Sequence, residues 1–287
     1  MTAATEGNYP AAYLMNQLSP TEIASYESEG YLVPGCRLPK EKVASLRDAL
    51  DRVVEANPDT RPEQLVSAHL EQSTGEGVRG DNEFLELAMD PGIVNMVSQV
   101  IGPDVILWGC QIFCKPGGDG MEVPWHQDGH YWPIRPLATC TAWIAIDDSL
   151  AGNGCLRVIP ASHRQAKLHD HLKEDRDDVV LNQRVDDTAF NAEQAIDIEL
   201  EAGQLSLHDA YLVHGSNPNR STRRRAGIAI RYMPGSSHFN REIDGPSAEV
   251  SYTIDFSQRP LWLLRGEDQT GLNDLQVGHK PPGTSRD

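Results

Sequence analysis

The chain has 287 residues, a formal net charge of −17 and a hydrophobic fraction of 39%. Its length allows one large domain with a sizeable core, and we expect a single domain over residues 1–265. The acidity argues against nucleic acid as a partner, because phosphate backbones would be repelled. No run of about 18 apolar residues occurs, so the sequence predicts no membrane-spanning helix and no membrane partner.

The cysteines and the first residues bear on location. The five cysteines are an odd number and form no Cys-x-x-Cys pair, which argues against a disulfide framework and predicts buried reduced thiols. The chain does not start with a basic segment followed by an apolar one, as a signal peptide would. Both features predict a cytoplasmic protein. Its oligomeric state is not indicated by the sequence.

Residues 18–102 carry helical patterns. Ser19 can cap a helix that begins at Pro20. Residues 40–57 repeat apolar side chains along one helical face. Residues 83–101 predict two helices, because a proline interrupts the pattern. The first third of the domain should therefore be helical.

Residues 103–235 change to short apolar runs separated by Gly and Pro, which is typical of strands. The runs are residues 105–108, 111–113, 141–146, 155–159, 195–200, 204–207 and 227–232. Helices followed by many short strands predict a mainly β protein, an antiparallel sandwich or barrel with helices on one side.

Two segments depart from the strand pattern. Residues 163–192 are highly charged, which predicts either a solvated surface helix and loop or a lid over a site. The sequence His169-Asp170-His171 within this segment is predicted to lie on the surface. Residues 266–287 are polar and rich in Pro and Gly, so we expect a mobile tail.

His126 and Asp128 form a candidate metal motif. On a strand, residues two apart share one face, so an imidazole and a carboxylate can reach the same divalent ion. A third ligand from His208 or His214 would complete two histidines and one carboxylate. This triad suits iron(II) and leaves three coordination positions, which a bidentate 2-oxo acid and O2 can fill.

An arginine run, Arg223-Arg224-Arg225, follows this second histidine region. A guanidinium group can hold a carboxylate through two parallel hydrogen bonds, as the far carboxylate of 2-oxoglutarate requires. A His-x-Asp motif alone arises often by chance. The downstream histidine and the arginine together make the prediction of a 2-oxo acid site much more specific.

The sequence around the first motif, residues 125–164, is WHQDGHYWPIRPLATCTAWIAIDDSLAGNGCLRVIPASHR. This segment strongly resembles the phytanoyl-CoA dioxygenase family. The segment around Gly30-Tyr31, the His214-Gly215-Ser216 sequence and the later arginine extend the resemblance over about residues 20–234. The resemblance implies a double-stranded β-helix (jelly-roll) core and an Fe(II)- and 2-oxoglutarate-dependent dioxygenase.

The resemblance also implies roles for single residues. It assigns iron to His126, Asp128 and His214, and so favours His214 over His208 as the third ligand. Arg225, rather than its two arginine neighbours, would bind the C5 carboxylate of 2-oxoglutarate. The residues expected to line the cosubstrate pocket are Ser216, Trp143 and, as a weaker candidate, Gln111.

The substrate pocket is less defined. The candidates are His130, Tyr131, Trp132, Arg157 and Arg231, and we expect His130 to share the face of the two first metal ligands. Basic side chains near the motif, Arg135 included, would suit a small anionic substrate. The sequence lacks the WHSDFETWH motif of ectoine hydroxylases. Related halogenases lack the carboxylate ligand, so Asp128 predicts hydroxylation.

The function predicted is hydroxylation of a small polar or anionic metabolite, such as an amino-acid derivative, an osmolyte or an aminophosphonate. An acyl-CoA 2-hydroxylase is the alternative within the family. Two other classes stay open, a cupin-like zinc or manganese enzyme and a jelly-roll module that binds a ligand without catalysis. Arg225 and the His214-Gly215-Ser216 sequence argue against the cupin-like enzyme, because such a reaction needs no 2-oxo acid, and the intact triad argues against the non-catalytic module.

Overall fold

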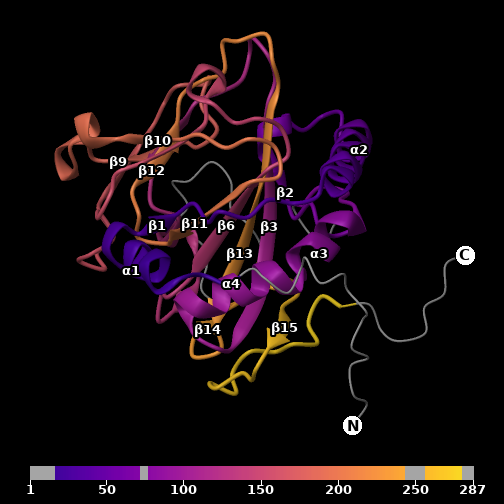
Figure 1. The fold of residues 1–287 in the computed structure, drawn as a ribbon, viewed down its shortest axis with the longest axis vertical. Coiled ribbons are helices and arrows are strands. Elements are labelled where there is room, and N and C mark those ends of the chain that lie inside the picture. Colours follow the sequence, from indigo (N-terminus) through magenta and orange to yellow (C-terminus); the bar gives the residue numbers. More distant parts are fainter. Residues whose placement is uncertain (1–16, 72–76, 243–255, 280–287) are drawn as a thin grey trace, which may run out of the picture.

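The computed structural model describes residues 17–71, 77–242 and 256–279. Helices α2 to α4 lie along one side of a large sheet, and a smaller sheet lies on its other side (Figure 1). No helix within the described ranges is both long and apolar enough to cross a membrane.

Four α-helices form the outer layer, as predicted for the first third of the chain. They are α1 (Pro20–Glu29), α2 (Lys40–Ala56), α3 (Asn82–Ala88) and α4 (Pro91–Ile101). Ser19 caps α1 in a reciprocal capping box, which satisfies backbone groups that the first turn leaves unpaired. Helix α4 packs against the large sheet and covers strands of its centre.

The large sheet has seven strands in the order β1-β11-β6-β13-β3-β15, with β2 paired to β3. Its strands are β1 (Tyr31–Leu32), β2 (Leu65–Val66), β3 (Val105–Lys115), β6 (Cys140–Ala145), β11 (Leu205–Asp209), β13 (Arg225–Pro234) and β15 (Trp262–Arg265). The predicted strands over residues 105–108 and 111–113 are one strand, because β13 pairs with β3 along its whole length.

The smaller sheet has the order β10-β7-β12-β4. It is built from β4 (Val123–His126), β7 (Leu156–Val158), β10 (Ile196–Ile198) and β12 (His214–Ser216). Two further pairs are β5 (Ile134–Arg135) with β14 (His238–Phe239), and β8 (His171–Lys173) with β9 (Gln183–Val185). Short 3₁₀ turns are η2 (Pro62–Gln64), η3 (Asp128–Tyr131), η4 (Ala151–Asn153), η5 (Asp187–Ala189) and η6 (Ala192–Gln194).

Strand β13 separates two interiors, because successive side chains of a strand point to opposite faces. Ile228 and Ile230 belong to the main core beneath the helices. Ala229 packs with Trp143 and Leu156 in the smaller core between the two sheets. The residues that alternate with the isoleucines therefore point into the sandwich, where the site lies.

The segment 163–192 differs from the surface helix that one prediction gave. It contains no α-helix: β8 and β9 form a hairpin, and β9 packs against β4. His171 is partly buried rather than fully exposed, and its ring is stacked on His130 with centroids 3.9 Å apart. Charged side chains of the segment form ion pairs, such as Lys173 with Asp175 and Arg184 with Asp187.

Residues 266–279 also differ from the expected mobile tail. The Asn273 side chain is 8% exposed and donates to the Ser237 carbonyl, while the Glu267 amide donates to the Asp104 carboxylate. A ring nitrogen of His279 lies 2.9 Å from the Leu261 carbonyl oxygen. The polar side chains of this segment hydrogen-bond to backbone groups, so its polar composition is compatible with a defined structure. The remainder of the predicted tail, residues 280–287, lies outside the described residues.

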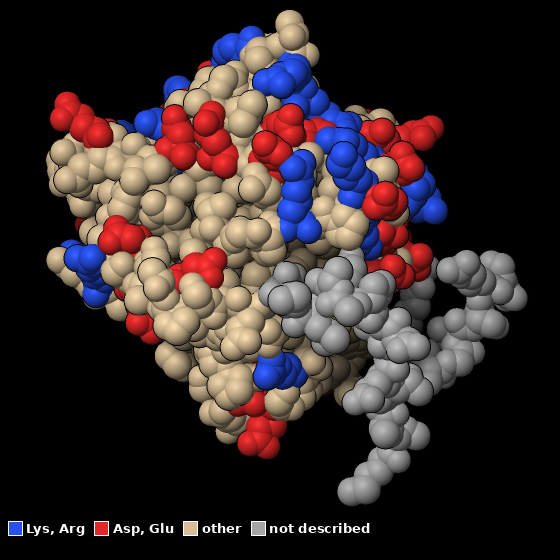
Figure 2. All heavy atoms as spheres, viewed as in Figure 1, with Lys and Arg blue, Asp and Glu red and all other residues tan. Residues whose placement is uncertain are grey.

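The surface carries the excess of acidic side chains together with many basic ones. On the face in Figure 2, lysines and arginines alternate with aspartates and glutamates over the upper part, and the lower part carries few charges. All five cysteines are free and four are buried, as expected for reduced thiols. Burial raises the pKa of Cys140 to about 12, so this thiol stays protonated.

Candidate active site

Two paired strands bring the predicted histidines together. His126 ends β4 and His214 begins β12, and the two residues are direct partners in the antiparallel register. In each ring, Nδ1 lies 2.9 Å from a backbone carbonyl oxygen, of Pro124 and of Leu212 respectively. Such contacts fix the ring orientation and leave Nε2 for a metal.

Asp128 is presented by a turn rather than by the strand itself. The chain stays extended at Gln127 and then enters η3, so Asp128 still faces the same way as His126. The Gln127 side chain is fully buried and donates to the Tyr211 carbonyl at 2.7 Å. A Cβ on Gly129 would overlap the end of the Leu137 side chain, so this turn packs closely against that residue.

The two oxygens of the Asp128 carboxylate have different surroundings. Oδ1 lies 3.6 Å from His126 Nε2 and 3.9 Å from His214 Nε2. Oδ2 accepts a hydrogen bond of 3.1 Å from the Thr141 hydroxyl and lies 3.6 Å from His208 Nε2. Burial raises the pKa of Asp128, but the histidines outweigh it and hold the pKa well below its ordinary value. Asp128 is therefore a carboxylate with one oxygen available as a ligand.

The donor set fits a divalent metal. One ligand atom from each of His126, Asp128 and His214 lies within 4.8 Å of the others, and all three side chains are buried. Burial lowers the pKa of His214 well below its ordinary value, which keeps the imidazole neutral as a metal ligand must be. Two imidazoles and one carboxylate on one side of a cavity match the ligands of non-haem iron oxygenases.

His208, the competing histidine, is also at the site but outside this group of three. It is 2% exposed, and neither ring nitrogen has a hydrogen-bond partner among the described residues. The structure places it beside Oδ2 of Asp128, where it lines the first cavity.

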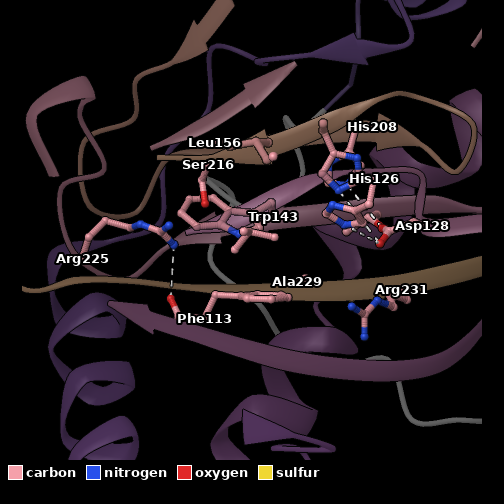
Figure 3. A pocket seen from close by; sticks show the side chains of 14 residues that line it. Phe113, His126, Asp128, Trp143, Leu156, His208, Ser216, Arg225, Ala229 and Arg231 are labelled. Carbon is pink, nitrogen blue, oxygen red and sulfur yellow. Dashed lines mark hydrogen bonds and ion pairs between the residues drawn. The ribbon is translucent and has the colours of Figure 1, made fainter. Parts of the chain in front are cut away.

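The first cavity extends from the triad to Arg225, with an empty volume of about 450 Å³ that is partly open to solvent. Trp143 and Ser216 line it, and the Arg225 guanidinium lies 5.5 Å from the Trp143 ring centre. Arg225 is 2% exposed and donates to the backbone carbonyls of Gly154 and Phe113. Figure 3 shows Arg225 at one end of this cavity and Arg231, beside Asp128, at the other.

Lys115 is a buried lysine that sequence analysis did not identify. Its Nζ donates to the Ser216 hydroxyl at 2.6 Å and to neighbouring carbonyl groups. Burial and the nearby Arg225 both lower the pKa of Lys115 well below its ordinary value. The Arg225 guanidinium and the Ser216 hydroxyl, to which Lys115 donates, thus offer hydrogen-bonding groups to a carboxylate at this end of the cavity. The lysine is 101 residues from Ser216 in sequence, so no local motif indicates it.

A second cavity shares His126, Asp128, Phe113 and Arg231 with the first. Its other lining residues include Trp108, Gln111, Tyr131, Trp132, Phe256 and Arg259. Tyr131, Trp132 and Arg231, three of the predicted substrate-pocket residues, line this second cavity together. Gln111 differs: it lines this cavity rather than the Arg225 cavity, and it accepts a hydrogen bond from Arg231.

Two other predicted pocket residues lie elsewhere. His130 does not continue the face of the motif, because η3 turns the chain, and its ring contacts Gln183 Oε1 at 3.0 Å and His171. Arg157 forms an ion pair of 2.9 Å with Asp197 and lies over the Trp125 ring. Neither residue lines the two cavities. Arg135 is exposed and donates to backbone carbonyls of its own loop.

The sandwich of two antiparallel sheets and the triad between them define a class, the jelly-roll metalloproteins with two histidines and one carboxylate. The profile of the phytanoyl-CoA dioxygenase (PhyH) family matches residues 26–227. The chain therefore belongs to this family of 2-oxoglutarate-dependent non-haem iron oxygenases, with iron and 2-oxoglutarate as its cofactor and cosubstrate.

Individual relatives are distant. The human peroxisomal phytanoyl-CoA dioxygenase is 26% identical over 253 residues, covering 82% of this chain and 73% of that protein. An ectoine dioxygenase of Bordetella parapertussis is 24% identical over 255 residues and covers 78% of each chain.

Solved structures confirm the predicted jelly-roll fold. The non-haem monooxygenase ThoJ superposes with a TM-score of 0.65 at 21% identity, covering 89% of this chain and 85% of that chain. EctD from S. alaskensis, solved with 2-oxoglutarate and 5-hydroxyectoine, has a TM-score of 0.60 at 20% identity and covers 76% of each chain.

Proposed function

We propose that the protein is an Fe(II)- and 2-oxoglutarate-dependent dioxygenase that hydroxylates a small polar or anionic metabolite. The reaction consumes 2-oxoglutarate and O2 and releases succinate and CO2, with one oxygen atom entering the substrate and the other entering succinate. The observation that carries the proposal is a triad whose His126 and Asp128 line two cavities, of which the first reaches Arg225 and the second reaches Arg259.

His126, Asp128 and His214 would hold the iron, since their ligand atoms converge and their other polar atoms are engaged or buried. When bound, iron with 2-oxoglutarate supplies the activation of O2 that breaks an unreactive C–H bond. A carboxylate at position 128 occupies the place where a halide would bind, which favours hydroxylation.

The Arg225 cavity is the proposed site of 2-oxoglutarate. The guanidinium of Arg225 would bind the C5 carboxylate, and Ser216 would present its hydroxyl to the same group because Lys115 fixes it. Trp143 forms an apolar wall that excludes water from the bound cosubstrate. Buried donors act more strongly in such a low-dielectric place than in water.

The second cavity is the proposed site of the substrate, because it also borders His126 and Asp128. Its tryptophans and Tyr131 would surround the substrate, and Arg231 would attract negative charge. Orientation of the target C–H bond toward the metal is the main task of these residues.

An acyl-CoA 2-hydroxylase of the phytanoyl-CoA type is the second candidate. It is favoured by the similarity to phytanoyl-CoA dioxygenases of human and Bos taurus, the latter 24% identical over 280 residues. The two candidates differ in substrate size, so a comparison of acyl-CoA thioesters with small free acids separates them.

Anaerobic reconstitution with iron(II) and 2-oxoglutarate tests the proposal. We expect the weak visible charge-transfer band of a 2-oxo acid bound to iron, followed by O2-dependent succinate formation with a suitable substrate. Zinc-loaded protein serves as the control and should give neither signal. A folded, iron-loaded protein without the band would contradict the proposal and favour a cupin-like enzyme.

A further inference from the structure

Two arginines meet in the second cavity without an ion-pair partner among the described residues. Arg231 extends from β13, and Arg259 comes from the segment that precedes β15. Arg259 is 7% exposed. By contrast, Arg224 on the outer side of the same sheet pairs with both Asp51 and Asp147. Acidic side chains are abundant in this chain, yet Asp128, a proposed metal ligand, is the one acidic residue among the described residues that line this cavity.

Neutral groups hold both guanidinium groups in place. Arg231 donates to Gln111 Oε1 at 3.0 Å, and its guanidinium carbon lies 5.5 Å from the Trp132 ring centre and 5.8 Å from that of Trp108. Arg259 donates to the Ser67 hydroxyl at 2.9 Å. Ser67 has a φ of 62°, a left-handed conformation that non-glycine residues adopt mostly at special positions.

Several hydrogen-bond donors remain unused. Arg231 Nε and Trp108 Nε1 are buried and have no partner among the described residues. Burial and the neighbouring Arg231 cation lower the pKa of Arg259 to about 10. An unpaired buried cation and an unsatisfied buried donor are both unfavourable, and a bound anion relieves both.

We propose that Arg231 and Arg259 together bind one oxyanion group of the substrate, a carboxylate or a phosphonate. The carbon framework would then lie against the rings of Trp108, Trp132 and Phe256, which line the same cavity. This inference rests on the proposed function, since it names the substrate class of the same site. It assigns Arg259 to binding, and the family profile ends at residue 227, well before it.

The test measures binding apart from catalysis. Full-length protein is loaded with iron(II) and saturating 2-oxoglutarate without O2, so that Arg225 is occupied. Tryptophan fluorescence is then titrated with benzoate, hexanoate and phenylphosphonate, and with the neutral controls benzamide and hexanamide. We expect saturable quenching by at least one anion and at least about tenfold weaker binding of its neutral counterpart, because charged hydrogen bonds are lost.

Variants assign the binding to the two arginines. Arg231→Gln and Arg259→Gln should each raise the anion Kd at least about tenfold. Arg231→Lys and Arg259→Lys keep the charge but lose the planar fork, and should give smaller increases. Arg52→Gln removes a guanidinium from an exposed position on α2 and is the matched control. Thermal unfolding checks that each variant is folded.

The outcomes separate the inference from the proposed function. Anion binding that is equal in wild type and in the folded glutamine variants overturns the inference, as does equal binding of amides and acids. Failure of every anion to bind while the charge-transfer band is normal overturns the inference alone. Absence of the band overturns the proposed function. Benzoate and phenylphosphonate, compared directly, show whether the site prefers a carboxylate or a phosphonate.

Discussion

The inner face of β13 carries an arginine at two positions, 225 and 231, and the surroundings of these two side chains differ. Arg225 is buried and tied to backbone carbonyls of Gly154 and Phe113, with Lys115 behind its neighbour Ser216. Arg231, six residues and about 20 Å further along the strand, has aromatic neighbours and an unused Nε. His126 and Asp128 line both cavities, and His214 lines the first.

This difference is informative because backbone hydrogen bonds fix a guanidinium, whereas aromatic rings leave its donors available. A fixed arginine suits an invariable ligand such as 2-oxoglutarate. An arginine with free donors suits the ligand that defines the particular enzyme. Under the proposed function, one end of this strand would bind the cosubstrate and the other end the substrate.

Asp128→Ala should have the largest effect, because this carboxylate belongs to both cavities. We expect loss of O2-dependent succinate formation and a fall in iron affinity beyond the roughly 10–100-fold that an outer partner contributes. Iron titration and succinate assay measure the two effects. Asp177→Ala, at an exposed position, is the control. Wild-type turnover in Asp128→Ala would remove the residue from the site.

Arg225→Gln should affect the cosubstrate end alone. Loss of a charged hydrogen-bonding group predicts a 2-oxoglutarate Kd about 10–100-fold higher, with little change in iron affinity. The charge-transfer band measures this affinity under anaerobic conditions. The exposed Arg223→Gln should bind 2-oxoglutarate like the wild type, and equal effects of both variants would refute the assignment.

Gly227→Ala tests how tightly the cosubstrate end is packed. An added Cβ would overlap the Trp143 ring, so we expect a loss of about 1–3 kcal/mol in unfolding free energy and weaker binding of 2-oxoglutarate. Gly152→Ala has open space around its Cβ and should change stability by less than about 0.5 kcal/mol. Denaturant unfolding of both variants checks the prediction, and equal stabilities would contradict it.

Thr141→Val removes the hydrogen bond to the non-ligand oxygen of Asp128 while keeping the side-chain shape. Iron affinity should fall about tenfold, as is typical for an outer partner of a metal ligand. Thr139→Val is a matched control, since its buried hydroxyl has no partner among the described residues. A similar loss in both variants would indicate a packing effect.

Arg157→Gln should have the smallest effect, although the sequence made this residue a pocket candidate. Its partly exposed ion pair with Asp197 contributes at most about 1 kcal/mol to stability. We expect unchanged affinity for 2-oxoglutarate and for the anionic probes. A tenfold loss of probe binding would return Arg157 to the substrate pocket and weaken the contrast between the two ends of β13.

Local patterns predicted much of this arrangement. The proline that separates α3 from α4, the capping residue Ser19 and the apolar strand runs each act over a few residues, so they are readable in sequence. The motif of His126 and Asp128 is local too. The family resemblance added His214, which the structure brings into register with His126.

Long-range contacts could not be predicted in the same way. Arg259 reaches Ser67 across 192 positions, and Lys115 reaches Ser216 across 101. His171 looked like a surface residue because its neighbours are charged, yet the hairpin folds it against Gln127 and His130. Burial, and to a smaller extent the neighbouring His130, lower the pKa of His171 to about 3. Only the fold determines such partners.

A side-by-side titration of Arg225→Gln and Arg231→Gln tests the central claim most directly. Each iron-loaded variant is titrated without O2, first with 2-oxoglutarate and then with the anionic probes. We predict that Arg225→Gln loses affinity for 2-oxoglutarate, while Arg231→Gln binds 2-oxoglutarate normally and loses affinity for the probes. Equal losses of 2-oxoglutarate affinity in the two variants would contradict the account of two separate ends.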